Sequence, residues 1–496
     1  MVGRCKTQCQ DVIVVNDGST DRTAQILRDI DGITIVDLPK NSGKGTALKA
    51  GFRKALEAGF TYAITLDADG QHYPEDIPLL LQANIAHPDA IIIGERKDLD
   101  SKERSGGSKF ANAFSNFWFC VQTGRRLRDT QTGYRLYPLH KLYGLSLLTS
   151  RYEAELELLV FSAWHGVKLV QQPINVYYPP KEQRVSHFRP AYDFTRISIL
   201  NTCLCFLALL YGLPMALLRW FMILFRSLYA LSFFVMCTTL FLIPLTKIYP
   251  LLQHNAEKRT WGLHLILYYI GRLVINWHGI PGVRYEKHNA NVNVNVNNEN
   301  ETLRYENFAK PAMVICNHQS PLDLMAMLEI SPRMAILTKD WVYRNPLFGK
   351  VLQQGEYYPV SMGMDDLLPK LQSLIDRGYS IVIYPEGTRS ADGRIQRFHK
   401  GAFEIARALN LDIVPILEYA PGRVLPKGGK YLRKGIIHMD IGRRVPPEEY
   451  LQYGETREIA SHFRQYYTQR YIEVSDHIDR TTHHFPFFVS LKPINV

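Results

Sequence analysis

His318 and Asp323 form the clearest chemical signal in the sequence. They lie in residues 316–323, CNHQSPLD, where a short apolar run ends and a helical pattern begins. A carboxylate in the first turn of a helix, five residues after a histidine, can accept a hydrogen bond from one imidazole nitrogen. The other nitrogen then faces a substrate hydroxyl as a general base. Such a base suits acyl transfer from a thioester to a hydroxyl, because a thiolate leaves readily.

A second polar block, residues 384–390, reads YPEGTRS and again follows an apolar run. Gly387 permits a tight turn, and the planar guanidinium of Arg389 suits a phosphate or carboxylate group. Residues 398–401, FHKG, and 414–416, VPI, follow in order. We expect one substrate site to contain Asn317, Glu386, Gly387, Thr388, Arg389, Lys400 and Gly401.

The N-terminal part carries a different set of residues, in three blocks that each follow a predicted strand. In residues 12–21, VIVVNDGSTD, Asp17 ends the strand and could bind a nucleotide base or ribose. In residues 41–47, NSGKGTA, a glycine-rich turn opens a helix, where Lys44 could meet a phosphate. In residues 66–71, LDADGQ, Asp67 and Asp69 are two residues apart. Paired carboxylates of this kind hold a divalent cation, Mg²⁺ or Mn²⁺, that bridges a diphosphate.

Alternating short apolar runs and helical patterns position these residues. The N-terminal region has predicted strands at 11–15, 33–38, 62–66 and 90–94 and helices at 20–28, 44–58 and 75–86. From about residue 280 the alternation resumes, with strands at 312–316, 334–337, 380–384 and 412–417 and helices at 322–329, 366–377 and 400–409. This order predicts an α/β chain whose mainly parallel sheets have helices on both faces.

Two stretches between these regions contain no charged residue. They cover residues 197–218 and 227–246, 22 and 20 residues respectively, and each is long enough to cross a bilayer as a helix. We expect two apolar membrane helices, either as a spanning hairpin or lying in the interface; buried core helices are the alternative. The predicted domains are residues 1–195, 196–250 and 251–496. An Asn/Val-rich insertion at 288–300 is interpreted as a surface loop or a polar β-ribbon.

The composition of the chain indicates which kinds of partner it binds and in which cellular compartment it lies. The formal net charge is +11, but Lys and Arg are scattered and no nucleic-acid-binding motif occurs, which favours lipid and phosphorylated substrates. None of the seven cysteines forms a CxxC pair, as expected in a reducing cytoplasm. The first ten residues have no apolar core, so no signal peptide is predicted. We expect a membrane protein with both catalytic domains on the cytoplasmic side.

The three C-terminal blocks resemble those of the glycerolipid (1-acylglycerol-3-phosphate-type) acyltransferases, over about residues 219–471. The resemblance implies acyl-CoA or acyl-carrier protein as donor, no cofactor for this domain, His318 as base and Asp323 as its partner. It places Glu386, Gly387 and Arg389 at the acceptor site. Family members have a Gly-x5-Arg block whose Arg holds the acceptor phosphate, whereas residues 355–363, GEYYPVSMG, contain no Arg. This departure favours a glycolipid acceptor over lysophosphatidic acid.

Residues 11 to about 180 resemble family-two glycosyltransferases related to dolichyl-phosphate mannose synthase. The resemblance implies a GT-A-like fold, a nucleotide-sugar donor and a lipid acceptor. Residues 129–137, DTQTGYRLY, look like the acceptor-side block, with Asp129 as base and Gln131 and Arg135 as substrate contacts; residues 152–155, YEAE, resemble the next helix block. The first strand of the family is missing before residue 11, which implies either a truncated gene or a damaged domain.

Three readings of the whole chain remain open. It could be a bifunctional enzyme that glycosylates and acylates one lipid, or an acyltransferase with a vestigial sugar-transfer domain. The third is a non-catalytic membrane scaffold that binds nucleotide sugars or acyl carriers, against which the two complete residue sets argue.

Overall fold

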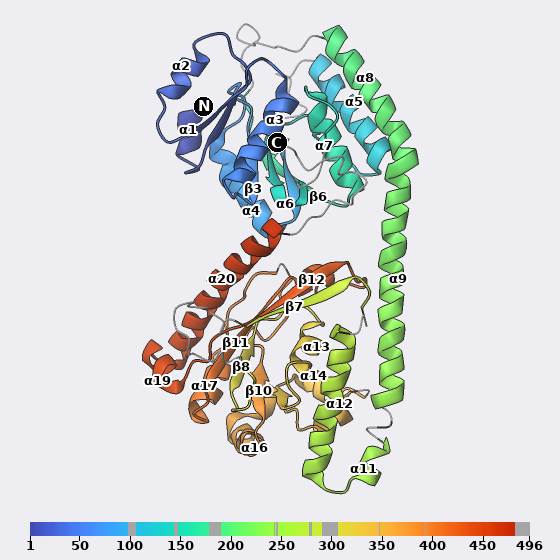
Figure 1. Cartoon of the computed structure of the whole chain (residues 1–496), viewed down its shortest axis with the longest axis vertical. Coiled ribbons are helices and arrows are strands. Elements are labelled where there is room, and N and C mark those ends of the chain that lie inside the picture. The colour runs from blue at the N-terminus through green and yellow to red at the C-terminus, as the bar shows by residue number, and fades with distance from the viewer. Residues whose placement is uncertain are drawn as a thin grey trace, which may run out of the picture. The chain divides into compact units, whose positions relative to one another are not determined.

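The computed structural model describes residues 1–97, 106–142, 147–177, 190–242, 244, 247–276, 280–289, 306–346, 348–391 and 393–481. The chain forms two compact units (Figure 1). Residues 1–219, together with 476–496, make up the first unit, and residues 220–475 make up the second.

The first unit alternates strands and helices, as the sequence predicts. Its elements are α1 (Val2–Lys6), β1 (Ile13–Asn16), α2 (Thr23–Arg28), β2 (Thr34–Asp37), α3 (Lys44–Glu57), β3 (Tyr62–Thr65), η1 (Pro74–Asp76), α4 (Ile77–Ala86), β4 (Ala90–Arg96), α5 (Gly106–Thr123), β5 (Arg135–Pro138), α6 (Leu139–Leu142), α7 (Glu153–Trp164) and β6 (Lys168–Ile174). Each predicted strand and helix of this unit is present to within a few residues.

The pairing of these strands differs from the mainly parallel sheet that we expected. Strands β1 and β2 pair in parallel as a separate two-stranded sheet. The other sheet has the order β3-β5-β4-β6, in which β5 is antiparallel to both β3 and β4. The chain returns after α5 and inserts β5 between two strands that lie earlier in the sequence. As a result, residues 129–135 pass beside the end of β3, where Asp67 and Asp69 follow.

Residues 197–218 and 227–242 of the two apolar stretches belong to one helical run, not to a hairpin. The run consists of α8 (Pro190–Leu207), a π-turn η3 (Ala208–Gly212), α9 (Leu213–Cys237) and a second π-turn η4 (Thr238–Leu242). Among the described helices only this one, Phe194–Phe241, is long and apolar enough to cross a membrane. The prediction of two membrane helices is therefore not confirmed.

Local chemistry explains why the chain does not turn between these stretches. Pro214 follows directly on the π-turn η3, where the regular i→i−4 hydrogen-bond pattern is already interrupted, so its missing backbone N–H is tolerated. Arg219 and Arg226 stay in the helix because each donates to a nearby carbonyl, of Trp164 at 3.0 Å and of Pro281 at 2.5 Å respectively. In a hairpin, these two arginines would lie in the loop between the helices. Here each guanidinium has a hydrogen-bond acceptor while the residue stays helical.

The second unit is built around a six-stranded sheet. Its elements are α11 (Tyr249–Leu252), α12 (Ala256–Asn276), β7 (Val283–Asn289), β8 (Met313–Cys316), α13 (Asp323–Leu328), β9 (Met334–Ile336), α14 (Asp340–Tyr343), α15 (Gly349–Gln354), η5 (Val360–Met362), α16 (Met364–Asp376), β10 (Ser380–Ile383), α17 (Gly401–Ala408), β11 (Ile413–Tyr419), α18 (Pro421–Val424), β12 (Gly435–Ile441), α19 (Pro447–Tyr450), η6 (Leu451–Tyr453) and α20 (Thr456–Thr481).

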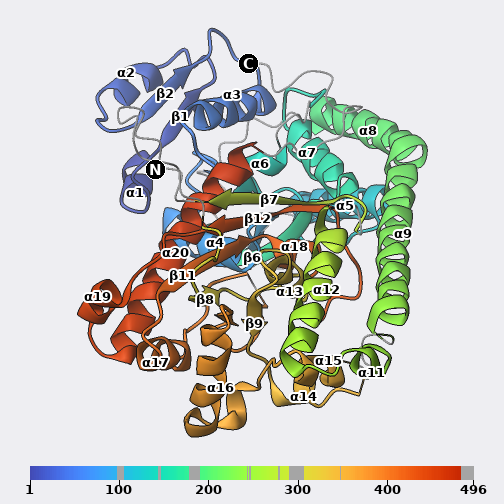
Figure 2. The ribbon, with the colours of Figure 1, turned by 60° about the horizontal axis from the view of Figure 1, so that its bottom comes forward.

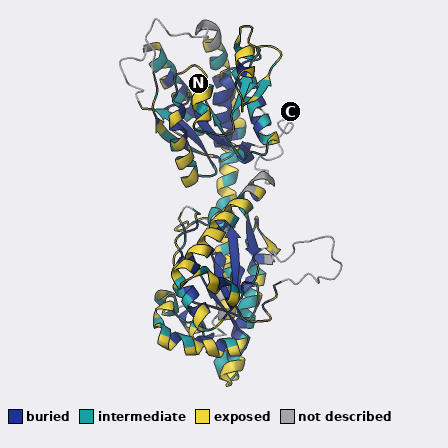
Figure 3. Cartoon of the chain, turned by 90° about the vertical axis from the view of Figure 1, so that its left-hand side faces the viewer, coloured by how far each residue is buried: buried dark blue, intermediate teal, exposed yellow. Residues whose placement is uncertain are grey.

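The sheet order β7-β12-β11-β8-β10-β9 is parallel except for the β11–β12 pair. Strands β8, β10 and β11 are buried at every residue, and Figure 3 shows them as the dark centre of this unit. Helix α13, which follows β8, packs against α12. Figure 2 shows α16 and α17 beside the same sheet but away from α12 and α13. Because β8, β10 and β11 are parallel neighbours, their carboxyl ends meet at one edge of the sheet.

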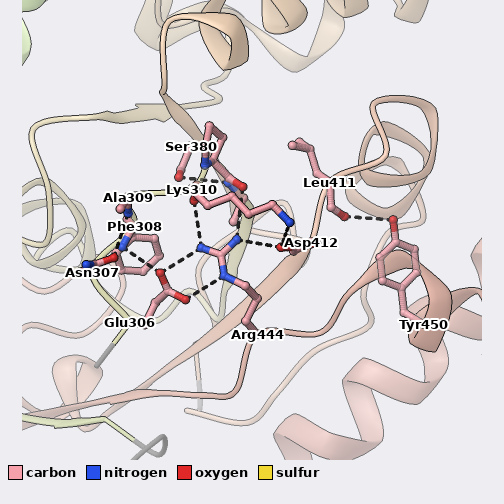
Figure 4. A network of polar contacts seen from close by, with 12 residues as sticks. Glu306, Asn307, Phe308, Ala309, Lys310, Ser380, Leu411, Asp412, Arg444 and Tyr450 are labelled. Atoms are coloured by element: carbon pink, nitrogen blue, oxygen red, sulfur yellow. Dashed lines mark hydrogen bonds and ion pairs between the residues drawn. The ribbon is translucent and has the colours of Figure 1, made fainter. Parts of the chain in front are cut away.

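A network of ion pairs around buried Asp412 joins Glu306 to the start of β11 (Figure 4). Both oxygens of Glu306 accept from the guanidinium of Arg444 at 2.9 Å, and the same guanidinium donates to Asp412 at 3.0 Å. Lys310 also donates to Asp412 at 2.8 Å. The predicted insertion at 288–300 lies almost wholly outside the described residues, so its two interpretations stay open.

Candidate active sites

The loop after β8 brings His318 and Asp323 into direct contact. The imidazole Nδ1 lies 2.9 Å from Oδ2 of Asp323, which opens α13 and is fully buried. The same oxygen accepts from the backbone N–H groups of Gln319 at 2.7 Å and Ser320 at 2.9 Å. Three donors thus fix one carboxylate oxygen, and an ionised Asp323 holds the imidazole with its proton on Nδ1. The predicted pair is present as a hydrogen-bonded dyad.

The ring of His318 is held on its face as well as on its edge. Tyr384, at the end of β10, stacks on it with ring centroids 4.3 Å apart and 28° between the planes. The His318 side chain is 22% exposed, and Nε2 makes no hydrogen bond within the described part of the chain. The nitrogen that would take a proton from substrate is therefore the open one.

Glu386 lies behind the dyad and does not face solvent. It is 3% exposed, and its two oxygens accept from the backbone N–H groups of His318 at 3.1 Å and Gln396 at 3.3 Å. A further backbone hydrogen bond runs from Ser390 to the carbonyl of His318 at 2.7 Å. Glu386 therefore joins the loop of His318 to the EGTRS loop, and its contact with the acceptor stays a prediction.

The remaining predicted residues of this site divide between surface and core. Gly387 takes a positive φ of 65°, which explains the glycine, and both it and Thr388 are exposed. Arg389 is half-buried and has no hydrogen-bond or ion-pair partner among the described residues. Lys400 pairs with Glu404 at 2.8 Å, just before Gly401 begins α17.

Asn317 is fully buried and ties β8 to β11. Its side chain accepts from the backbone N–H of Glu418 at 2.7 Å and donates to the carbonyl of the same residue at 2.9 Å. This pairing places Glu418 beside the loop that carries His318. Sequence reasoning missed Glu418, because its only signal was an acidic residue inside an otherwise apolar strand.

In the first unit the N-terminal blocks also come together. Both carboxylate oxygens of Asp17 accept from backbone N–H groups of the glycine-rich turn, from Ser42 at 2.7 Å and Gly43 at 2.8 Å. That contact sets the start of α3, and with it Lys44. Asp17 therefore organises the predicted phosphate turn.

Lys44 lies between two carboxylates. Its Nζ is 2.8 Å from Asp67 and 2.9 Å from Glu155, which belongs to the YEAE block on α7. Burial opposes the charge on Lys44, but Glu155 and Asp67 outweigh that effect and raise the pKa of its ammonium group. The predicted phosphate ligand and one predicted cation ligand are thus neighbours, joined by a glutamate whose role the sequence left undefined.

The region around Asp67 and Asp69 suits a divalent cation. Asp67 is about one-third exposed, Asp69 is exposed, and the backbone of residue 133 passes so close that a Cβ on Gly133 would lie 2.5 Å from Asp67. Buried His72 lies near both carboxylates, and neither of its ring nitrogens has a hydrogen-bond partner within the described residues. Burial lowers the pKa of the His72 imidazole, which favours its neutral form.

The residues of the DTQTGYRLY block are more buried than their predicted roles would suggest. Asp129 is inaccessible to solvent, and its two oxygens pair with Arg96 at 2.6 and 2.7 Å. Arg135 is also fully buried and donates to the carbonyls of Thr130 at 2.8 Å and Glu155 at 3.2 Å. In this structure Arg135 supports the loop beside Asp67.

Gln131 differs from its neighbours in the block, because its side chain is exposed. The roles assigned to Asp129, Gln131 and Arg135 stay predictions.

Comparisons with known proteins give the same two-part division. Residues 7–134 match the family model of glycosyl transferase family 2, and residues 293–417 match the family model described as acyltransferase.

Each of the two regions has relatives among known proteins. A polyprenol monophosphomannose synthase of Mycolicibacterium smegmatis is 32% identical over 190 residues, which are 35% of this chain and 70% of that protein. A chloroplastic 1-acyl-sn-glycerol-3-phosphate acyltransferase of Arabidopsis thaliana is 33% identical over 141 residues, 27% of this chain. The chain spans 39% of the length of that acyltransferase.

Among solved structures, the 1-acyl-sn-glycerophosphate acyltransferase PlsC of Thermotoga maritima aligns with a TM-score of 0.41 and 18% identity. That alignment covers 52% of this chain and 98% of the other. Through its N-terminal region the chain belongs to glycosyl transferase family 2, and in the same polypeptide residues 293–417 match the acyltransferase family model.

Proposed function

We propose that the second unit transfers an acyl group from a thioester, acyl-CoA or acyl-carrier protein, to a hydroxyl of a membrane lipid. The observation that carries the proposal is the His318–Asp323 dyad, with Nδ1 held at 2.9 Å and Nε2 open. Nε2 takes the proton of the acceptor hydroxyl while the oxygen attacks the thioester carbonyl. The C–S bond then breaks, and the proton passes from His318 to the departing thiolate.

The acceptor fits a lipid with an anionic or sugar head group. Arg389, which has no partner among the described residues, supplies a donor fork next to the loop that carries His318. Residues 355–363 contribute no arginine; instead Tyr357 is buried there, stacked on His264 at 4.8 Å. With fewer cations than a site for lysophosphatidic acid would need, we expect a glycolipid to be the better acceptor.

Transfer from labelled acyl-CoA and acyl-carrier protein to a panel of lipid acceptors tests this function. His318→Ala should lower the rate by about 10²–10⁴ while the protein stays folded. The matched control is His254→Ala, which alters an exposed histidine outside the site. A His318→Ala rate close to wild type would remove His318 from the reaction.

We propose a second activity for the first unit, the transfer of a sugar from a nucleotide sugar to a lipid acceptor. It is supported by the contacts of Asp17 with the phosphate turn and by the cluster of Lys44, Asp67 and Glu155. Asp67 and Asp69 would hold Mg²⁺ or Mn²⁺, which when bound would neutralise the diphosphate of the leaving nucleotide. Lys44 would orient the same phosphates.

The two activities are proposed to act in series on one lipid. If so, Asp69→Ala should lower the acylated product in cells while leaving acylation of an added glycolipid unchanged. Active sites tethered in one chain would keep the intermediate at a high effective concentration. An unchanged amount of product in cells would mean that acylation does not depend on sugar transfer.

We also propose that the long helix lies along a membrane surface and that both domains face the cytoplasm, where nucleotide sugars and acyl thioesters occur. A helix of 48 residues is about 72 Å long at about 1.5 Å per residue, more than twice the thickness of a hydrocarbon core. In the apolar 18-residue stretch of this helix, only 17% is buried. Its large exposed side chains include Leu209, Leu210, Leu217, Phe221, Leu228 and Leu231.

Two experiments bear on this placement. The chain should stay with membranes through a high-salt wash, since apolar contact outweighs screened charge. Protease added outside sealed right-side-out vesicles should cut neither domain. Cleavage of one domain alone would show that the helix crosses the membrane, and release by salt would show that it does not bind lipid.

A further inference from the structure

Glu418 is an acidic side chain buried inside the second unit with no hydrogen-bond donor for either oxygen. It lies on β11 and is 0% exposed, and both carboxylate oxygens lack a partner among the described residues. An ionised carboxylate in such a place is strongly disfavoured, because water is lost and nothing replaces it. The group must therefore be neutral, and the proton that it keeps needs a hydrogen-bond acceptor.

The carboxylate of Asp323 is suited to accept a hydrogen bond from that proton. Oδ1 of Asp323 is buried and also lacks a donor among the described residues, although Oδ2 takes three. Glu418 and Asp323 are neighbours whose side chains interact. One proton between them satisfies both otherwise unpaired groups, and it belongs on Glu418, because Asp323 already accepts three hydrogen bonds and Glu418 accepts none.

The groups around Glu418 favour the neutral form. Those that interact with it are Asp323 on α13, Tyr285 on β7, Cys316 on β8 and Tyr384 after β10, none of them a cation. Burial first, and the nearby Asp323 charge second, raise the pKa of Glu418 well above its ordinary value. The clamp of Asn317 on the backbone of Glu418 keeps the residue in place.

We propose that Glu418 is a positioning residue for acyl transfer, whose protonated carboxyl donates a hydrogen bond to Oδ1 of Asp323 and so keeps Oδ2 aimed at His318. This inference rests on the proposed acyltransferase activity. In this arrangement Asp323 carries donors on both oxygens, from the loop on one side and from β11 on the other. It cannot rotate away from the imidazole when the substrate proton arrives.

Two variants separate this role from a merely structural one. Glu418→Gln keeps the shape and donates through its amide, so the turnover number should stay within about threefold of wild type and the acid limb of the pH–rate profile should not move. Glu418→Leu loses the donor, so the turnover number should fall tenfold or more while the KM for the acyl donor is unchanged. If Glu418 were ionised, Glu418→Gln would remove a charge near His318 and shift the acid limb to lower pH, which would overturn the proposal.

A spectroscopic measurement on the full chain does not depend on turnover. Infrared spectra at pH 7 should show the carbonyl band of a protonated carboxyl group in the wild-type protein, and this band should be missing from the spectrum of Glu418→Gln. Glu404→Gln, which alters a glutamate paired with Lys400 at the surface, should leave the band in place. A missing band in wild type refutes the protonation of Glu418, whereas a band without acyl transfer in wild type refutes the proposed function alone. Wild-type turnover by a folded Glu418→Leu protein would also refute the positioning role.

Discussion

Replacing Asp323 with Asn isolates the charge of the dyad from its geometry. Oδ2 of Asp323 accepts all three hydrogen bonds, from His318, Gln319 and Ser320, at 2.7–2.9 Å. The amide oxygen of Asn can take that position and keep all three. What is lost is the negative charge facing the imidazole that becomes protonated during the reaction.

The size of the effect follows from the short distance and the burial of the carboxylate. Asp323 is 0% exposed, and two unit charges about 4 Å apart interact by about 4 kcal/mol at an effective dielectric constant of about 20. Because about 1.4 kcal/mol corresponds to a tenfold change, the full charge is worth up to about 10³ in rate. We expect Asp323→Asn to lower the turnover number by about 10²–10³ and to leave the KM for the acyl donor nearly unchanged.

Single-turnover transfer of a labelled acyl group, measured from pH 5 to 9, provides the assay. Asp366→Asn is the matched control, because it removes an exposed aspartate from the first turn of α16. A folded Asp323→Asn protein with a turnover number within threefold of wild type would refute the reasoning, since the charge would then contribute nothing to proton transfer.

Three other perturbations test different parts of the chain. His264 donates to the carbonyl of Gly355 at 2.7 Å, and burial lowers its pKa from 6.5 to about 4. Between pH 6.5 and 4 the unfolded chain therefore binds a proton that the folded chain does not, so the unfolding free energy should fall as the pH drops through this range. His264→Gln should remove this pH dependence from a series of denaturant-unfolding measurements. Arg135→Met should destabilise the first unit by about 1–3 kcal/mol for each buried acceptor left unpaired, measured by thermal unfolding. Asp67→Asn should weaken calorimetric binding of Mn²⁺ with a nucleoside diphosphate at least tenfold, whereas an unchanged affinity would exclude Asp67 as a ligand.

Local pattern was enough for much of this protein. Each predicted strand and helix of the two α/β units lies within a few residues of an observed one, because alternating apolar runs and helical periodicity are properties of short segments. The dyad is equally local: His318 and Asp323 are five residues apart, and the loop between them supplies two of the three donors. Sequence alone therefore determined that His318 and Asp323 pair and how they face each other.

Hydropathy could not decide how the apolar segments connect. Two uncharged stretches separated by Arg219 and Arg226 have the composition of a hairpin, but a continuous helix has the same composition. The choice depended on carbonyl partners for the two arginines, at Trp164 and Pro281. Those partners lie more than 50 residues away in sequence, and no local signal marks them.

The surroundings of both sites were decided by tertiary structure. Glu418 meets Asp323 from a strand 95 residues further on, Glu386 binds the backbone of His318 from 68 residues away, and Glu155 reaches Lys44 from a later helix. The insertion of β5 between β3 and β4 brings Gly133 against Asp67. A sequence shows which residues can ionise, but whether each is charged depends on burial and on neighbours that only the folded chain brings within reach.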